Sequence, residues 1–243
     1  MPSVLAYHRP QTLDDVSELS RRPNTRLIGG GTVVVPDARA AGADGVEIID
    51  LQALGLDVIE PASGDRLTLG AMVRLGVLAA DGRVPELLRD LARRELPSAL
   101  RNQATVGGTV GLGAADSVLV AGLLVHAAEV DIHGAGTVPL EGLLAAGAPT
   151  GVITAVRVEC SGAGSIAATG RTPADDPIVA AIARKGPAGV RVALTGVAPA
   201  PIEVDPADPI ASLAPPGDFR GSAAYRLHLA ETLTRRAVQE VSP

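Results

Sequence analysis

A glycine-rich stretch in the middle of the chain, Thr105 to Asp116, constrains the fold more than any other feature. Its sequence, TVGGTVGLGAAD, holds four glycines and no obvious acid, base or nucleophile before the closing aspartate. Glycine permits positive φ angles, and its missing β-carbon lets the main chain approach a ligand closely. A second stretch, Gly29–Thr32 (GGGT), likewise follows a short β-like run and ends in threonine. Exposed N–H groups of such turns form concave anion sites, so both stretches are either ligand-binding surfaces or ordinary turns of an α/β protein.

The spacing of apolar residues predicts a mixed α and β chain in two parts. Helices are expected to begin at Thr12, Val84 and Ser117, and a closing helix capped by Ser222 carries apolar residues at steps of four up to Val241. The expected strands are residues 25–28, 46–51, 129–132, 152–160 and 189–198, with a hairpin over residues 56–72. The stretch 161–165, SGAGS, is the candidate linker between the two parts.

Composition excludes several classes of function. The 243 residues carry a net charge of −6, whereas a nucleic-acid binder would show a basic face. Two tyrosines, one phenylalanine and no tryptophan leave only backbone and aliphatic side chains to support a planar ligand. The single cysteine, Cys160, and four scattered histidines give no disulfide, zinc or iron–sulfur pattern. The N-terminus has no apolar signal core and no apolar run is long enough to span a membrane, so we expect a cytoplasmic protein without membrane insertion.

A dinucleotide-binding fingerprint must be considered at Gly111–Asp116, because GLGAAD nearly fits G-x-G-x-x-G and Asp131 follows at the distance of a ribose-binding acid. The third glycine is replaced by Asp116, however. The preceding run, RNQATV, is also too polar for the buried first strand of a parallel sheet. The residues therefore disfavour a Rossmann site.

Several separate motifs, taken in order, carry a resemblance to a known family. They are LIGGGTVVVP at 27–36, LTLGAM at 67–72, LRNQATVGGTV, AAD and LLVHAAEVDI within 100–132, GRTPADDPIVAA at 170–181, VRVALTGVAPAP at 190–201 and the closing FRGSAAYRLHLAETLTRRAV at 219–238. Together they resemble the FAD-binding medium subunit of molybdenum hydroxylases, the carbon monoxide dehydrogenase-like and xanthine dehydrogenase-like enzymes. The match runs over nearly the whole chain.

The resemblance implies an α+β fold in two domains. Residues 1–160 would form a PCMH-type FAD-binding domain, of the kind shared with vanillyl-alcohol oxidases, made of two subdomains. Residues 165–243 would form a small domain like the C-terminal domain of the CO dehydrogenase flavoprotein. The FAD contacts carried over by position are Gly29, Gly30, Gly31, Thr32, Val33, Val34, Gly70, Ala71, Thr105, Gly107, Gly108, Thr109 and Asp116. Main-chain N–H groups of both glycine stretches would hold the FAD diphosphate, and Asp116 could also cap the helix that follows it.

The chain departs from the family within the binding motifs. The family usually has a polar residue at the position of Val33 and asparagine at the position of Thr109, and its segment before Asp116 is about two residues longer. A lysine of the family appears as Ala168. Each lost polar contact typically weakens binding by about 1 kcal/mol. The departures favour, as an alternative, a scaffold subunit of the same fold that no longer binds FAD.

The function implied by the resemblance is electron transfer, and no residue is a candidate catalytic acid or base. A molybdopterin-binding large subunit would oxidise the substrate, and a 2Fe–2S small subunit would pass the electrons to FAD on this chain, which would deliver them to an external acceptor. The chain would thus be an oxidoreductase subunit that is active only with its partners. A stand-alone flavin enzyme or an unrelated α/β nucleotide binder is the remaining alternative.

Overall fold

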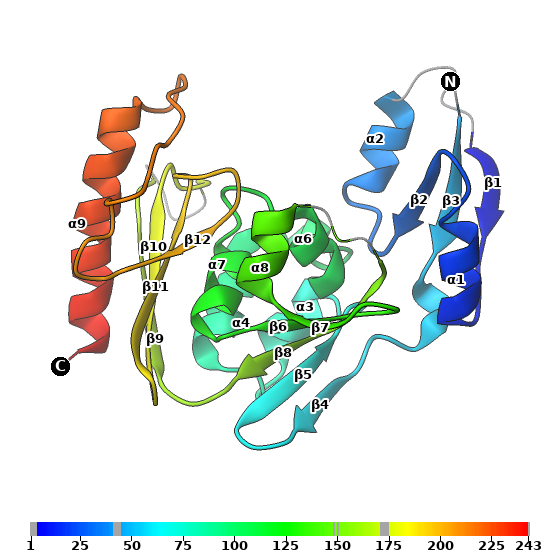
Figure 1. The fold of residues 1–243 in the computed structure, drawn as a ribbon, viewed down its shortest axis with the longest axis horizontal. Coiled ribbons are helices and arrows are strands. Elements are labelled where there is room, and N and C mark those ends of the chain that lie inside the picture. The colour runs from blue at the N-terminus through cyan, green and yellow to red at the C-terminus, as the bar shows by residue number, and fades with distance from the viewer. Residues whose placement is uncertain (1–3, 41–44, 148, 150, 171–174, 243) are drawn as a thin grey trace.

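The computed structural model describes residues 4–40, 45–147, 149, 151–170 and 175–242, which fold around three β-sheets arranged side by side (Figure 1). The sheets have three, five and four strands and follow one another along the chain, apart from helical insertions. We refer to the three parts as the N-terminal lobe, residues 4–51, the middle lobe, residues 59–159, and the C-terminal lobe, residues 163–242.

The N-terminal lobe is a parallel three-stranded sheet in the order β1-β3-β2. Its elements are β1 (Val4–His8), α1 (Leu13–Leu19), β2 (Thr25–Ile28), α2 (Val34–Ala40) and β3 (Val46–Asp50), and a 3-10 turn (Gln52–Leu54) leads out of it. The predicted helix at Thr12 is confirmed, since the Thr12 side chain accepts a hydrogen bond from the Asp15 N–H at 3.2 Å. Both predicted strands are confirmed, whereas β1 and α2 were not predicted.

The middle lobe is an antiparallel sheet in the order β4-β5-β8-β6-β7, packed against helices. The strands are β4 (Ile59–Ala62), β5 (Arg66–Gly70), β6 (Glu129–Ile132), β7 (Gly136–Pro139) and β8 (Ile153–Glu159). The helices are α3 (Leu75–Ala80), α4 (Glu86–Glu95), α5 (Ser98–Arg101), α6 (Val106–Leu112), α7 (Val118–Val125) and α8 (Leu140–Ala146). The predicted hairpin is β4 and β5. The uninterrupted apolar run of α7 is buried at every position, as its sequence predicts.

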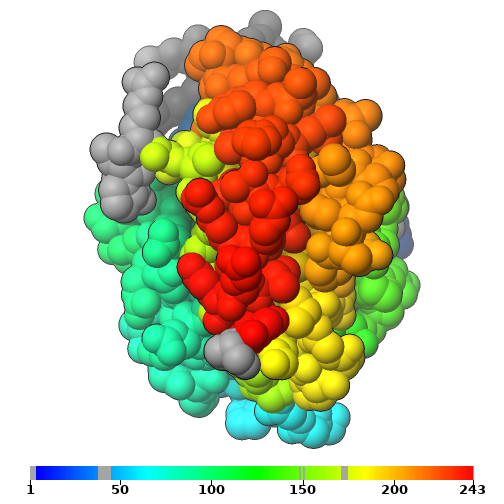
Figure 2. Space-filling model, turned by 90° about the vertical axis from the view of Figure 1, so that its left-hand side faces the viewer, coloured from blue at the N-terminus to red at the C-terminus, as the bar shows by residue number. Residues whose placement is uncertain are grey.

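The C-terminal lobe is an antiparallel sheet sandwiched between α7 and the closing helix α9 (Ala223–Val241), which lies across its outer face (Figure 2). Its strands are β9 (Ala163–Ala168), β10 (Ala180–Gly186), β11 (Gly189–Thr195) and β12 (Ile202–Val204). Alternate residues of β10 serve the two faces: Ala180 and Ile182 join the core of the middle lobe, and Ala181 and Ala183 pack under α9. The Ser222 cap of α9 is confirmed by the N–H of Tyr225, which donates to its hydroxyl at 3.2 Å.

The candidate linker at 161–165 is shorter than predicted. The chain leaves the middle sheet after Glu159 and enters β9 at Ala163, so the last three residues of SGAGS lie in a strand. Small residues give no strand signal by themselves. Here pairing with β10 and a hydrogen bond from the Ser165 hydroxyl to the Ala237 carbonyl at 2.8 Å hold them extended. The domain boundaries at 160 and 165 stay a prediction.

The N-terminal lobe meets the rest of the molecule through few contacts. Its elements pack mainly against one another. An apolar cluster of Val16, Ile49 and Leu51 with Met72 and Val152 of the middle lobe joins the two parts. Among the described residues, no helix is both long and apolar enough to cross a membrane.

Candidate functional site

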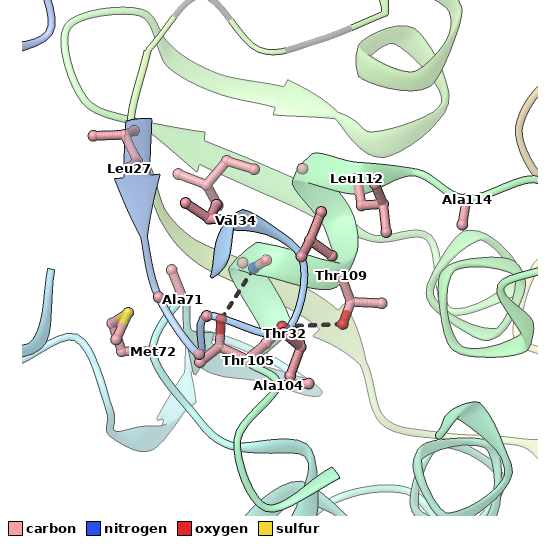
Figure 3. Close-up of a pocket in the computed structure, with 18 of the residues that line it drawn as sticks. Leu27, Thr32, Val34, Ala71, Met72, Ala104, Thr105, Thr109, Leu112 and Ala114 are labelled. Carbon is pink, nitrogen blue, oxygen red and sulfur yellow. Dashed lines mark hydrogen bonds between the residues drawn. The ribbon is translucent and has the colours of Figure 1, made fainter. Parts of the chain in front are cut away.

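A cavity of about 560 Å³ lies where the N-terminal and middle lobes meet (Figure 3). This volume falls in the range of cofactor and ligand sites. Twelve of the thirteen residues predicted to contact FAD line it: Gly29, Gly30, Gly31, Thr32, Val33, Val34, Ala71, Thr105, Gly107, Gly108, Thr109 and Asp116. Residues separated by up to 87 positions in the chain are thus brought to one surface.

The first glycine stretch forms a tight turn between β2 and α2. Gly31 has a φ angle of +74°, which favours glycine. No described residue accepts a hydrogen bond from the main-chain N–H groups of residues 29–33. Successive unpaired N–H groups ahead of a short helix form a concave surface that suits an anion. This part of the cavity therefore offers donors to a negatively charged ligand.

Two glycines of this turn are required by the protein itself. A β-carbon on Gly30 would lie 2.0 Å from the Gln103 carbonyl oxygen, and one on Gly29 would lie 2.9 Å from the Thr105 side-chain oxygen. The turn thus packs directly on the segment that leads into α6. Close contact between the lobes accounts for both glycines.

The second glycine stretch is a helix, α6, and not the loop that the sequence predicts. Thr105 caps it: its side-chain oxygen accepts the Gly108 N–H at 3.1 Å, and the Gly107 N–H donates to the Ala71 carbonyl at 2.8 Å. The expectation that both glycine stretches offer free N–H groups is therefore wrong for Gly107 and Gly108. The Thr109 hydroxyl also donates within the protein, to the Thr105 carbonyl at 3.0 Å (Figure 3).

Gly107 and Gly108 of α6 face different surroundings. A β-carbon on Gly107 would lie 2.7 Å from the β-carbon of Ala71, so the packing of Ala71 excludes a larger residue at this position. Of the described residues outside its own helix turn, a β-carbon on Gly108 would meet the Thr105 side-chain oxygen alone, at 3.0 Å. Gly108 thus keeps space open at the cavity wall and supplies no donor to it.

Two expectations are not met: that Gly70 contacts the ligand and that Asp116 caps α7. Gly70 does not line the cavity. It ends β5 in the interior, where a β-carbon would lie 2.2 Å from the Leu56 carbonyl oxygen, so close packing explains it. Asp116 lines the cavity and is exposed, but it does not cap α7. Ser117 takes that position, its hydroxyl oxygen accepting the Val120 N–H at 3.1 Å.

Glu95, at the end of α4, lines the cavity and was not predicted. Its carboxylate accepts hydrogen bonds from the Ser117 hydroxyl at 2.6 Å and the Leu119 N–H at 2.8 Å. Burial raises the pKa of this carboxyl, and the charges of Asp116 and Asp176 add to the rise, while the two hydrogen bonds oppose it. In the sequence Glu95 looks like one more charge on an amphipathic helix, so only the fold reveals its position.

The remaining cavity wall is aliphatic. Leu27 and Leu51 of the N-terminal lobe, with Met72, Leu100 and Val152 of the middle lobe, supply apolar surface. No aromatic side chain is among the described lining residues. The cavity combines a surface of free donors, apolar walls and the three carboxylates of Glu95, Asp116 and Asp176. Such a surface fits an elongated ligand with an anionic group and a planar apolar group.

A family model described as the FAD binding domain in molybdopterin dehydrogenase matches residues 3–182. The chain belongs to this family. FAD is the cofactor of the family, and the α+β fold expected from the resemblance is confirmed. The matched motif at 170–181 includes residues 171–174, which lie outside the described residues.

Solved structures of carbon monoxide dehydrogenases and of a quinoline 2-oxidoreductase share the fold over almost the whole of the matched chains. Carbon monoxide dehydrogenase from Hydrogenophaga pseudoflava, lacking the Mo-pyranopterin moiety, is 22% identical with a TM-score of 0.88, covering 99% of this chain and 98% of that one. Reconstituted CO dehydrogenase from Oligotropha carboxidovorans is 22% identical with a TM-score of 0.85, and the match covers 99% of this chain and 98% of that one. Quinoline 2-oxidoreductase from Pseudomonas putida 86 is 22% identical with a TM-score of 0.84, and the match covers 98% of this chain and 97% of that one.

A curated relative, the uncharacterized protein YgfM of Escherichia coli K12, is 27% identical over 93% of this chain and 92% of its own length. The likeness in fold therefore extends over the C-terminal lobe as well, in proteins of similar length.

Proposed function

We propose that the chain is the FAD-binding electron-transfer subunit of a molybdopterin-dependent hydroxylase or dehydrogenase. Electrons would reach the bound FAD from iron–sulfur clusters on a partner subunit and leave to an external acceptor. The observation that carries the proposal is the row of unpaired N–H groups at residues 29–33, which opens into a cavity of about 560 Å³ in a protein of an FAD-binding family.

The residues present fit FAD. The N–H groups of the Gly29–Val33 turn would hold the diphosphate, because such groups stabilise negative charge without carrying a charge themselves. Gly108 would leave room for the ligand at the opposite wall, and the aliphatic side chains would cover the faces of its rings. Asp116 and Glu95 offer acceptors for hydroxyl or ring N–H donors. When bound, FAD supplies the oxidation–reduction chemistry, and the protein supplies binding, orientation and electrostatics.

Partner subunits are part of the proposal. A 2Fe–2S cluster held in the usual way needs four cysteine ligands, and the chain has one cysteine. Iron–sulfur clusters and the molybdenum centre would therefore reside on a small and a large subunit of a cytoplasmic complex. The three solved relatives named above are all molybdenum-enzyme structures or oxidoreductases by their descriptions, which supports this arrangement.

A scaffold subunit without FAD is the second candidate, and specific observations favour it. The N–H groups of Gly107 and Gly108 are bonded within the chain, and Val33 places an apolar side chain where the family has a polar one. Compared with the expectation from sequence, fewer donors are free to bind a diphosphate.

The visible absorbance spectrum separates the two candidates. The purified protein would be measured as isolated, and again after incubation with FAD and desalting. We expect a flavin spectrum retained at close to one FAD per chain. Protein that stays colourless after both treatments would contradict the electron-transfer role and favour the scaffold.

A further inference from the structure

Arg74 lies beside the candidate anion site without lining the cavity. It precedes α3 and pairs with Thr105 in a short antiparallel bridge, in which the Val106 N–H donates to the Val73 carbonyl at 2.9 Å and the Leu75 N–H to the Ala104 carbonyl at 3.0 Å. Directly opposed residues of antiparallel chains project their side chains from the same face. The Arg74 side chain therefore leaves the bridge on the face where Thr105 contacts the glycine turn.

The Arg74 guanidinium and Gly30 share one contact atom. Arg74 Nη1 donates to the Gln103 carbonyl oxygen at 2.5 Å and lies 3.3 Å from the Gln103 side-chain oxygen. A β-carbon on Gly30 would lie 2.0 Å from that same carbonyl oxygen. Because a Cα–Cβ bond is about 1.5 Å long, the guanidinium lies within roughly 6 Å of the Gly30 Cα. A full positive charge thus lies close to the turn that carries the free N–H groups.

No described carboxylate neutralises this charge. Arg66, Arg83 and Arg157, which also project from the middle lobe, each form an ion pair, whereas Arg74 forms none with any described acidic residue. The Gln103 carbonyl would otherwise present its negative end toward the turn. By binding that oxygen, Arg74 both fixes its position and offsets its partial charge.

We propose that Arg74 is a positioning residue for a diphosphate in the cavity. Its charge would also supply part of the attraction for the diphosphate that is lost because Val33, and not a polar residue, follows the glycine turn. The inference rests on the proposed FAD function. Arg74 holds the Gln103 carbonyl against Gly30, which fixes the glycine turn. Its charge adds a favourable field at the N–H groups of residues 29–33, because two charges several ångströms apart near a protein surface still interact appreciably.

The test is a set of FAD titrations of the apoprotein, followed by flavin fluorescence, with the wild type, Arg74→Gln and Arg74→Lys. Arg93→Gln is the matched control, since Arg93 also donates to a main-chain carbonyl, that of Ala79 at 2.8 Å, and has no described carboxylate partner. Each protein is titrated at about 0.02, 0.1 and 0.5 M salt, because salt screens charge–charge attraction over this range. Circular dichroism checks that each variant is folded.

We expect Arg74→Gln to weaken FAD binding about tenfold at low salt and to flatten its salt dependence. Arg74→Lys should keep most of the affinity and the full salt dependence, while Arg93→Gln should match the wild type. Equal affinities of wild type and Arg74→Gln would overturn the inference, and so would equal losses in the Gln and Lys variants with an unchanged salt dependence, because that pattern indicates a purely structural contact. A wild type that binds no FAD would overturn the proposed function as well.

Discussion

The glycines of the site have different roles, which the atoms around each β-carbon position distinguish. Gly30 and Gly107 have main-chain or side-chain atoms of the protein at less than 3 Å from the position of a β-carbon, whereas Gly108 has open space beyond the Thr105 side chain. The first two glycines allow the lobes and α6 to pack. The third leaves room for a ligand.

Replacing Gly108 by valine should therefore abolish FAD binding while the protein stays folded. The added side chain would occupy space at the cavity wall, and among the described residues its close neighbour is the Thr105 side-chain oxygen at 3.0 Å. The measurement is flavin content after reconstitution, with the thermal unfolding temperature of the apoprotein as the control for folding. Unchanged flavin content in a folded variant would show that the ligand does not approach Gly108.

Replacing Gly30 by alanine should instead lower the stability of the apoprotein. Its β-carbon would lie 2.0 Å from the Gln103 carbonyl oxygen, so the contact between lobes must open. We expect a loss of about 2 kcal/mol or more in the free energy of unfolding, as for other strained or overpacked substitutions. Gly82→Ala is the control, because no heavy atom of a described residue, apart from its chain neighbours, lies within 4 Å of its β-carbon position and its backbone is unstrained. Equal urea midpoints for the two variants would contradict the packing role of Gly30.

At the residue scale, the sequence predicted residues that the structure gathers at one cavity, but not how their main-chain groups are bonded. Both glycine stretches and Asp116 were predicted and line one cavity. That the Gly107 N–H is already bonded to the Ala71 carbonyl could not be predicted, because the acceptor comes from a segment 36 residues earlier in the chain. Glu95 was missed for a similar reason: its partners, Ser117 and Leu119, are brought to it by packing of α4 on α7.

Helix α7 is tied to its surroundings at both ends. At the N-terminal end, Glu95 accepts hydrogen bonds from the Ser117 hydroxyl and the Leu119 N–H. At the C-terminal end, the Nδ1 atom of buried His126 lies 2.6 Å from the Glu159 carbonyl oxygen at the end of β8. These contacts fix the helix that lies between the middle and C-terminal sheets.

Glu95→Ala should destabilise the protein by about 1–3 kcal/mol, because it leaves a buried hydroxyl and a helix N-terminal N–H without their acceptor. Glu95→Gln keeps one acceptor oxygen and should lose less. Urea unfolding of the three proteins at pH 7 measures the difference. An alanine variant as stable as the wild type would indicate that water replaces the carboxylate at no cost.

His126 should make stability fall as the pH drops. Burial, assisted by the Arg184 charge, lowers the pKa of His126 to about 4, against the hydrogen bond to the Glu159 carbonyl and the Glu159 charge. In the unfolded chain the group titrates near 6.5. Between these values the unfolded state binds a proton that the native state does not, so stability present above pH 6.5 is lost toward pH 4.

The loss attributable to this group is about 3 kcal/mol. His126→Asn keeps a side-chain N–H for the Glu159 carbonyl and cannot titrate. The difference in unfolding free energy between pH 7 and pH 4 should therefore be smaller in the variant by about that amount. Parallel pH profiles of wild type and variant would exclude His126 as the source.

At the element scale, the sequence predicted those helices and strands that have a clear apolar periodicity or a long apolar run. Helices α1, α4, α7 and α9 and the hairpin β4–β5 were expected and are present. Helix α6 was not, because paired glycines disfavour a helix. The Thr105 cap and the packing of Gly107 on Ala71 compensate here. Helix α2 was also missed: it opens with valines and carries Pro36 in its first turn, where proline is tolerated.

At the scale of the whole molecule, the cavity lies between the N-terminal and middle lobes, which make few other contacts with each other. The N-terminal lobe contributes the glycine turn, Leu27 and Leu51, and the middle lobe contributes α6, Met72 and Val152. Apart from the cavity walls, the apolar cluster around Val16 and an exposed contact of His133 Nε2 with Asp14 Oδ1 at 3.1 Å link the two. The relative position of the lobes should therefore respond to the ligand.

FAD should raise the stability of the whole chain and protect the N-terminal lobe in particular. At a free concentration one hundred times its dissociation constant, a ligand that binds only the folded state adds about 2.7 kcal/mol. Hydrogen exchange with and without FAD would locate the effect, and we expect the largest gain in protection at residues 27–35. Protection confined to the C-terminal lobe would contradict the position of the site.

The division of the cavity between two loosely joined lobes has a consequence for ligand fragments. A ligand that contacts both walls behaves like a bidentate chelator: once one half is seated, the other half meets its wall at a high effective concentration. FMN or AMP alone would each contact only one of the two lobes and would not hold the lobes together. The intact dinucleotide should therefore bind far more tightly than its separate halves would suggest, and hydrolysis of the diphosphate to FMN and AMP would release both halves at once.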